Sequence, residues 1–261
     1  MNGVGPEILL SILSKNQFPK NCTPVIYASY KNLENTKRDL SINCELRLIN
    51  SFSELEDSAI NVLEIDALGA TINYGKKDKA IGMLAYHCLA QAVKDLNGRN
   101  IDVLVTAPIN KETVQSKHFS FIGHTDYLSE NIEGSSVMMM VSDSLRVALL
   151  TEHLSLSKVT GFITKKLVES RTKSIHKTLQ LDFNISEPKI AMLSIDPHAG
   201  DNGVIGNIDN MVLVPCIRYM RKEGIMVNGP FPADSFFGSM KYKEFDAVIA
   251  PYHDQGLIPF K

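Results

Sequence analysis

Short runs of apolar, often β-branched residues alternate along the chain with longer stretches of helical periodicity. The runs predict strands at 24–28, 46–49, 62–65, 101–105, 189–195 and 248–250, and a hairpin of 137–141 with 146–150. The run at 101–105 is almost continuously apolar, which is typical of a strand buried in a parallel sheet. Helical spacing predicts three helices, one from near Asp78 to Asn97-Gly98, one over 164–181 and one over 209–224.

The order of these elements indicates the fold class. Strands that alternate with helices predict an α/β fold with a mostly parallel sheet. Neither an internal repeat nor a low-complexity linker divides the chain, so residues 1–261 are interpreted as one two-lobed unit. No shift in composition marks the boundary between the lobes, which we place near 155–164.

Composition and charge narrow the class of protein. The chain has 261 residues, of which 44% are hydrophobic and 21% charged, with a formal net charge of -2. Without a basic run, neither nucleic acid nor an anionic membrane surface is an expected partner, and no apolar stretch reaches the length of a membrane span or a signal-peptide core. The four cysteines lie far apart, which favours reduced, buried thiols over disulfides or metal ligation. We therefore expect a cytoplasmic protein.

Three of the seven histidines directly follow predicted apolar strands. They are His153 after 146–150, His198 after 189–195 and His253 after 246–250. Because ligands of open α/β sheets bind beyond the carboxyl ends of the strands, a sheet would bring these imidazoles to one edge. Three neutral imidazoles suit a divalent transition ion with open coordination positions. Any one of them is better explained as a cap or surface residue, but the three placements together favour a metal site.

Other polar segments carry a weaker signal. The loop from Thr106 to Lys111 suits an anionic substrate group, although Pro and Asn are also ordinary loop residues. Thr125 precedes a predicted helix and Asp234 ends a rigid Pro-rich loop, so each is either functional or a helix cap. Gly200, Gly203 and Gly206 permit close backbone approach to phosphates, but they do not form the G-x-G-x-x-G fingerprint. A Rossmann domain is therefore disfavoured, and the cofactor-binding residues stay unassigned.

Six motifs occur together in one order along the chain. They are Gly3-Val4-Gly5-Pro6-Glu7, Thr106-Ala107-Pro108-Ile109-Asn110-Lys111, Gly123-His124-Thr125-Asp126-Tyr127-Leu128, Asp196-Pro197-His198-Ala199-Gly200, Gly229-Pro230-Phe231-Pro232-Ala233-Asp234 and Tyr252-His253-Asp254-Gln255-Gly256-Leu257. This ordered set resembles the 4-hydroxythreonine-4-phosphate dehydrogenase family of pyridoxal phosphate biosynthesis over essentially the whole chain. The two histidine loops of the second half are its most specific part.

The resemblance implies a fold, a reaction and a site. The fold would be the two-lobed α/β fold of isocitrate and isopropylmalate dehydrogenases, in a homodimer whose active sites take residues from both subunits. NAD would oxidise the 3-hydroxyl of 4-phosphooxy-L-threonine to a β-keto acid, which decarboxylates to 3-amino-2-oxopropyl phosphate. One divalent ion per site (Zn, Mg, Co or Mn) would be held by residues matching His153, His198 and His253. The substrate would contact His124, Thr125 and Lys261, with Lys261 and Asp234 as catalytic residues.

The sequence departs from the family pattern in three places, and other functions are compatible with the same residues. The chain starts almost inside the first motif and ends at Lys261, so we expect it to be incomplete at both termini, and Asp196 stands where the family usually has Asn. A sister dehydrogenase for threonate or erythronate phosphate would use the same chemistry. A non-catalytic metal-binding homologue and a three-histidine zinc hydrolase are the alternatives from other classes.

Overall fold

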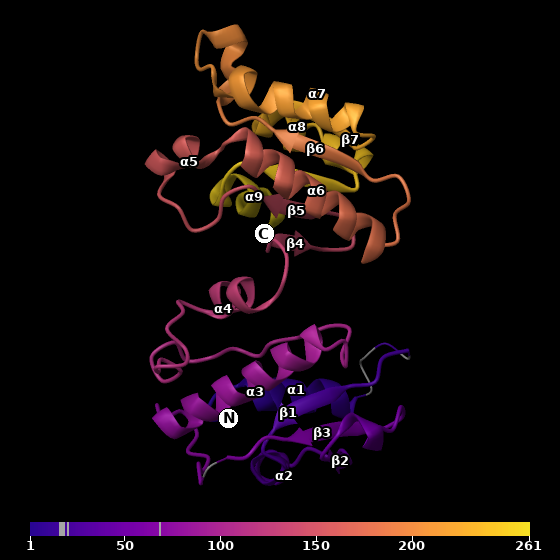
Figure 1. The fold of residues 1–261 in the computed structure, drawn as a ribbon, viewed down its shortest axis with the longest axis vertical. Helices are drawn as coiled ribbons and strands as arrows, with labels where there is room; N and C mark the ends of the chain where they lie inside the picture. The colour runs from indigo at the N-terminus through magenta and orange to yellow at the C-terminus, as the bar shows by residue number, and fades with distance from the viewer. Residues whose placement is uncertain (16–18, 20, 68) are drawn as a thin grey trace. The chain divides into compact units, whose positions relative to one another are not determined.

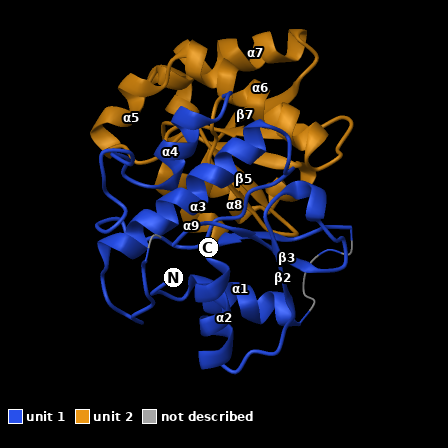
Figure 2. Cartoon of the chain, turned by 60° about the horizontal axis from the view of Figure 1, so that its bottom comes forward, with its two compact units in different colours: residues 1–134 blue, residues 135–261 orange. Residues whose placement is uncertain are grey.

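The computed structural model describes residues 1–15, 19, 21–67 and 69–261. These residues form two compact units, 1–134 and 135–261 (Figure 2). The region near 155–164, where the sequence placed the lobe boundary, lies inside the second unit. Val159 and Ile163 of that region are buried in the second unit's core, which explains why the chain does not divide there.

The first unit contains a three-stranded parallel sheet of order β1-β3-β2, formed by β1 (Val25–Ala28), β2 (Leu46–Ile49) and β3 (Ile60–Glu64). These strands match the predicted runs. The helices are α1 (Gly5–Ser14), α2 (Tyr30–Asp39), α3 (Lys79–Asn97) and α4 (His124–Asn131), with a 3-10 turn at Phe52–Glu54. Asp78 caps α3 as predicted, because its Oδ1 accepts the N–H groups of Ala80 at 2.7 Å and Ile81 at 3.4 Å.

The prediction of a buried strand at 101–105 is wrong. The segment forms no strand, and Val103 and Val105 are 74% and 88% exposed. Leu104 is partly buried and packs against the cluster that contains Leu89 and Val93 of α3 together with Phe119 and Tyr127. An apolar run becomes a buried strand only where neighbouring strands satisfy its backbone groups, and the run itself does not specify those neighbours.

The second unit is built on a five-stranded sheet of order β4-β5-β8-β6-β7. The strands are β4 (Met139–Val141), β5 (Arg146–Leu149), β6 (Lys189–Leu193), β7 (Met226–Phe231) and β8 (Ala247–Ala250). The predicted hairpin is confirmed as the antiparallel pair β4 and β5, while β5, β8, β6 and β7 run parallel. The sequence did not predict β7, whose Gly229 and Pro230 are poor strand formers.

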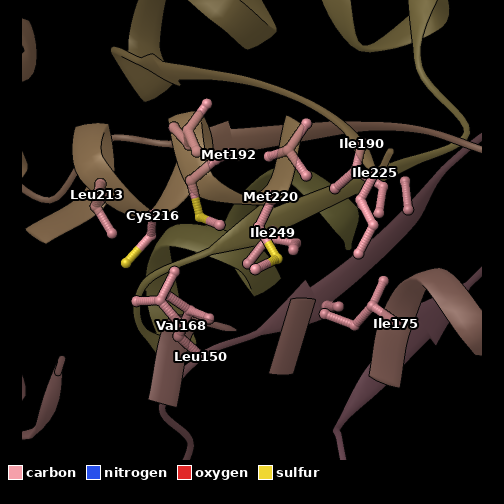
Figure 3. Close-up of a cluster of buried hydrophobic side chains, with 14 of the residues drawn as sticks. Leu150, Val168, Ile175, Ile190, Met192, Leu213, Cys216, Met220, Ile225 and Ile249 are labelled. Carbon is pink, nitrogen blue, oxygen red and sulfur yellow. The ribbon is translucent and has the colours of Figure 1, made fainter. Parts of the chain in front are cut away.

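Helices cover both faces of this sheet (Figure 1). One face packs against α5 (Leu156–Phe162), α6 (Lys165–Leu181) and α7 (Val214–Lys222); the labelled Ile190, Met192 and Ile249 of the strands lie among residues of α6 and α7 in Figure 3. The opposite face packs against α8 (Ala233–Gly238) and α9 (His253–Phe260). Shorter helical turns lie at Pro197–Gly203, Asp209–Leu213 and Lys241–Glu244.

The structure bears on two expectations from composition, the state of the cysteines and the presence of a membrane-spanning helix. All four thiols are free, and Cys216 is buried, but Cys22 is exposed, so the expectation of uniformly buried cysteines is wrong. Among the residues that the structure describes, no helix is both long and apolar enough to cross a membrane.

Candidate functional site

The three strand-end histidines follow three neighbouring strands of the second unit. β8 lies between β5 and β6 and pairs in parallel with both. His153 follows β5, His253 follows β8 and His198 follows β6, so their loops leave the sheet at the same carboxyl edge. This placement is the one that the sequence predicted from strand position.

His153 and His253 lie side by side at this edge. Their ring centroids are 5.8 Å apart, and the ring planes are inclined by 42°. Nδ1 of His253 lies 2.8 Å from Oδ1 of Asp254. A carboxylate accepts hydrogen bonds, so this contact places the ring proton on Nδ1 and leaves the Nε2 lone pair of His253 free for another partner.

His198 stands at the same edge without completing a three-residue cluster. No group of three or more His, Cys, Asp or Glu side chains in the described part of the chain is arranged to hold a metal ion. The structure therefore brings together two of the three predicted ligands. Two adjacent imidazoles, one with its tautomer fixed by a carboxylate, are donors that fit a divalent transition metal.

The loop that carries His198 has an unusual backbone. From His198 to Asn202 every residue is left-handed, with φ of 54°, 52°, 78°, 43° and 53°. Such a conformation costs a residue other than glycine roughly 1 kcal/mol or more, and strain of this kind persists only where surrounding contacts impose it. Gly200 is required for a second reason, because a Cβ there would lie 2.2 Å from the carbonyl oxygen of Gly206. The glycines of this loop are thus explained by the loop's own packing.

Hydrogen bonds tie the three histidine loops to one another. The hydroxyl of Thr151, before His153, donates to the carbonyl of Pro251, before His253, at 2.8 Å. The amide of Gln255 on α9 donates to the carbonyl of Ser194, which follows β6, at 2.7 Å. The edge is therefore a cross-linked structure in which the loops are positioned relative to one another.

Two carboxylates hold the backbone of these loops or of the segments next to them. Glu152 accepts the N–H of Met138 at 3.3 Å and lies 3.9 Å from Nη1 of Arg171, with both side chains largely buried. Asp209 is fully buried and accepts the N–H groups of Ile195 at 2.8 Å and Asp196 at 2.9 Å. Burial raises the pKa of Asp209, and these two hydrogen bonds act against that rise.

Sequence reasoning did not single out Thr151, Asp209 or Gln255. Thr151 and Gln255 each lie two residues from a strand-end histidine, and this proximity in sequence could have identified them as part of the site. Asp209 was interpreted only as the start of a helix, and its contact across the loop arises from tertiary packing.

Asp234 and Lys261 belong to the same unit. Asp234 lies in the first turn of α8, which follows β7, the next parallel strand along the edge after β6, and its side chain is exposed. Lys261 follows α9 and is exposed. Within the described residues neither side chain forms a hydrogen bond or ion pair with a histidine, so their predicted catalytic roles stay predictions.

His124 and Thr125 belong to the first unit, in the first turn of α4. Gly123 is the N-cap of this helix, so Thr125 does not cap it. The Thr125 side chain is exposed, whereas His124 is half-buried and burial lowers its pKa. At neutral pH this imidazole is therefore mostly uncharged. In the Thr106–Lys111 loop, Asn110 Oδ1 accepts the N–H groups of Glu112 and Thr113, a structural role.

The described residues thus form two α/β units with mostly parallel sheets, and the second unit carries paired histidines at the carboxyl edge of its strands. Comparison with known proteins identifies the family. Residues 20–261 match the model of the family described as pyridoxal phosphate biosynthetic protein PdxA. The chain belongs to this family.

Relatives and solved structures agree over the whole chain. The 4-hydroxythreonine-4-phosphate dehydrogenase of Bacteroides thetaiotaomicron is 38% identical over 100% of this chain and 72% of its own length. A protein of Oceanobacillus iheyensis with the provisional name D-threonate 4-phosphate dehydrogenase is 34% identical over 99% of this chain and 79% of its own length. The crystal structure of a 4-hydroxythreonine-4-phosphate dehydrogenase from Burkholderia phymatum superposes with a TM-score of 0.89 at 29% identity, over 99% of this chain and 79% of that one.

These matches confirm the resemblance and the fold class. The structural relatives share the fold of isocitrate and isopropylmalate dehydrogenases, and the names of the relatives identify the chain as an oxidoreductase of the dehydrogenase type.

Proposed function

We propose that the protein is a divalent-metal-dependent and NAD-dependent dehydrogenase that oxidises the 3-hydroxyl of 4-phosphooxy-L-threonine. The observation that carries the proposal is the His153–His253 pair at the strand edge of a chain that belongs to this family. Oxidation removes a hydride and a proton from the alcohol, and the resulting β-keto acid loses carbon dioxide to give 3-amino-2-oxopropyl phosphate. The reaction would serve pyridoxal phosphate synthesis in the cytoplasm.

In this proposal one set of residues binds the metal and another binds the substrate. His153, His198 and His253 would hold the ion, with Asp254 fixing the ring of His253. A bound divalent ion supplies Lewis-acid chemistry that can lower the pKa of a coordinated water from ~16 to ~7, and NAD supplies the hydride acceptor. Lys261 and Thr125 would bind the substrate's anionic groups, His124 would hydrogen-bond to it as a neutral imidazole, and Asp234 would be a supporting carboxylate.

The test is NADH formation by the purified chain with 4-phosphooxy-L-threonine, with and without added Zn²⁺, Mg²⁺, Co²⁺ or Mn²⁺. We expect metal-dependent turnover, which His253→Ala abolishes. His176→Ala is the matched control, because His176 lies on α6 and does not follow a strand, and it should keep metal binding and turnover. Turnover that needs no metal, or a fully active His253→Ala variant, would overturn the metal assignment.

A second substrate is favoured by the Oceanobacillus iheyensis relative. Threonate or erythronate 4-phosphate would need the same hydride transfer from a secondary alcohol. Parallel assays rank the substrates by kcat/KM. Metal binding without NADH formation from any of them would identify a non-catalytic homologue, and ester hydrolysis without NADH formation would identify a zinc hydrolase.

We also propose a homodimer whose sites combine residues of two subunits. The proposal rests on the family to which the chain belongs. Light scattering should give about twice the 28.9 kDa of the monomer. Mixing the inactive His124→Ala and His253→Ala proteins should restore part of the activity. A monomer at micromolar concentration would contradict the proposal.

A further inference from the structure

Asp209 closes the loop that carries His198. The loop leaves β6 through Ser194, Ile195 and Asp196, turns through its left-handed residues and returns to Asp209, the first residue of the helical segment that continues into α7. There the carboxylate accepts the N–H groups of Ile195 and Asp196. The two residues that lead into Pro197 and His198 are thus held by the residue at the other end of the loop.

The chemistry of this anchor requires a carboxylate. Two backbone donors converge on one side chain that is fully buried, and a carboxylate has an acceptor oxygen for each. An asparagine would offer one oxygen and one NH₂ group, so a donor would face a donor. The position at the start of a helix also favours negative charge.

The rest of the loop packs onto the anchored segment. A Cβ at Gly206 would lie 1.9 Å from Oδ2 of Asp196, and the carbonyl of Gly206 packs against Gly200. The hydroxyl of Ser194 donates to the carbonyl of Asp196 at 2.9 Å. A shift of Ile195 and Asp196 would therefore move the whole turn, including His198.

We infer that Asp209 is a positioning residue that sets His198 in its left-handed conformation at the strand edge for metal binding. The inference rests on the proposed metal role of His198. It assigns a function to a carboxylate that lies outside the three predicted ligands and contacts none of them.

The test uses the full chain and Co²⁺ alone as the probe, read by isothermal titration and by the visible absorption of the bound ion. Asp209→Asn should weaken Co²⁺ binding by up to roughly 10- to 100-fold, the range for removing a group hydrogen-bonded to a metal ligand, because Asp209 acts on His198 through the backbone of Ile195 and Asp196. It should also change the Co²⁺ spectrum. Asp95→Asn is the matched control. Asp95 is a buried carboxylate of α3 in the first unit that accepts hydrogen bonds from Tyr27, Gln91 and Asn100. It should lower the unfolding temperature and leave the affinity and spectrum unchanged.

Gly206→Ala keeps the Asp209 carboxylate, but its added methyl group would displace the side chain of Asp196. This variant tests whether moving Asp196 weakens metal binding if Asp209→Asn does not fold. It should reproduce the loss of Co²⁺ affinity. The inference is overturned if the folded Asp209→Asn or Gly206→Ala protein binds Co²⁺ with wild-type affinity and spectrum while His198→Ala loses binding. If His198→Ala itself binds Co²⁺ like the wild type, the proposed metal role of His198 fails instead.

Discussion

The hydroxyl of Thr151 donates a hydrogen bond to the carbonyl of Pro251 at 2.8 Å, and the backbone N–H of Thr151 donates to the same oxygen at 3.2 Å. The two residues are far apart in sequence, and each lies two positions before a histidine of the strand edge. This double contact joins the β5 and β8 loops where they leave the sheet. It therefore restrains the two loops whose His153 and His253 rings lie 5.8 Å apart.

Thr151→Val tests the importance of this contact. Valine keeps the shape of the side chain and removes the hydroxyl, while the backbone hydrogen bond to Pro251 remains. We expect a loss of about 1 kcal/mol in the free energy of unfolding, the usual net value of one buried hydrogen bond. Metal affinity should also fall, because the two histidine loops are then joined less firmly. Denaturant unfolding and Co²⁺ titration measure the two effects.

Thr172→Val is the matched control. Thr172 of α6 is also buried, but its hydroxyl has no hydrogen-bond partner within the described residues. Its replacement removes an unsatisfied polar group, so stability should stay the same or increase. If Thr151→Val is as stable and binds Co²⁺ as well as Thr172→Val, the Thr151–Pro251 bond does not organise the edge.

Gly200→Ala should damage the His198 loop. Its φ of +78° is unfavourable for alanine, and the added methyl would overlap the Gly206 carbonyl. We expect a destabilisation of about 2 kcal/mol or more, from strain and overpacking, together with weakened metal binding. Gly161→Ala serves as the comparison, because Gly161 lies inside α5 with open space around it and should gain about 0.5–1 kcal/mol. Equal unfolding midpoints for the two variants would show that the loop tolerates a side chain.

Metal addition and removal should change the stability of the folded chain. An ion that binds only the native state stabilises it by about 2.7 kcal/mol at a concentration of 100 Kd. Zn²⁺ should therefore raise the melting temperature, and EDTA should reverse the rise. The His153→Ala variant should show a much smaller shift. A shift of equal size in His153→Ala would mean that the ion binds elsewhere.

The positions of the histidines were predictable because they depend on topology alone. Parallel strands present their carboxyl ends at one edge, so a residue that follows such a strand is placed before any packing is known. The left-handed turn of His198 and the anchoring role of Asp209 depend on contacts between residues distant in the loop, and local pattern does not encode them. The apolar run at 101–105 shows the converse, since its pattern indicated a strand and the tertiary structure supplied no partner.

The last prediction concerns the two imidazoles whose pKa burial lowers, His124 in the first unit and His176 on α6 in the second. The unfolded chain binds a proton at these positions near the ordinary value of 6.5, whereas the folded chain binds it only at lower pH. The stability that each neutral ring contributes is therefore present above pH 6.5 and is lost as the pH falls from 6.5 toward the folded pKa.

Ring-proton NMR titration should show both histidines with a pKa below 6.5, assigned by the missing signals of His124→Gln and His176→Gln. Each variant should also lose less stability than the wild type when the pH falls from 7.5 to 5.5, as measured by thermal unfolding. A wild-type ring that titrates at or above 6.5 would contradict the prediction for that residue. For His124, a pKa above 7 would mean that the imidazole is mostly cationic at neutral pH and could pair with a phosphate in the proposed substrate role.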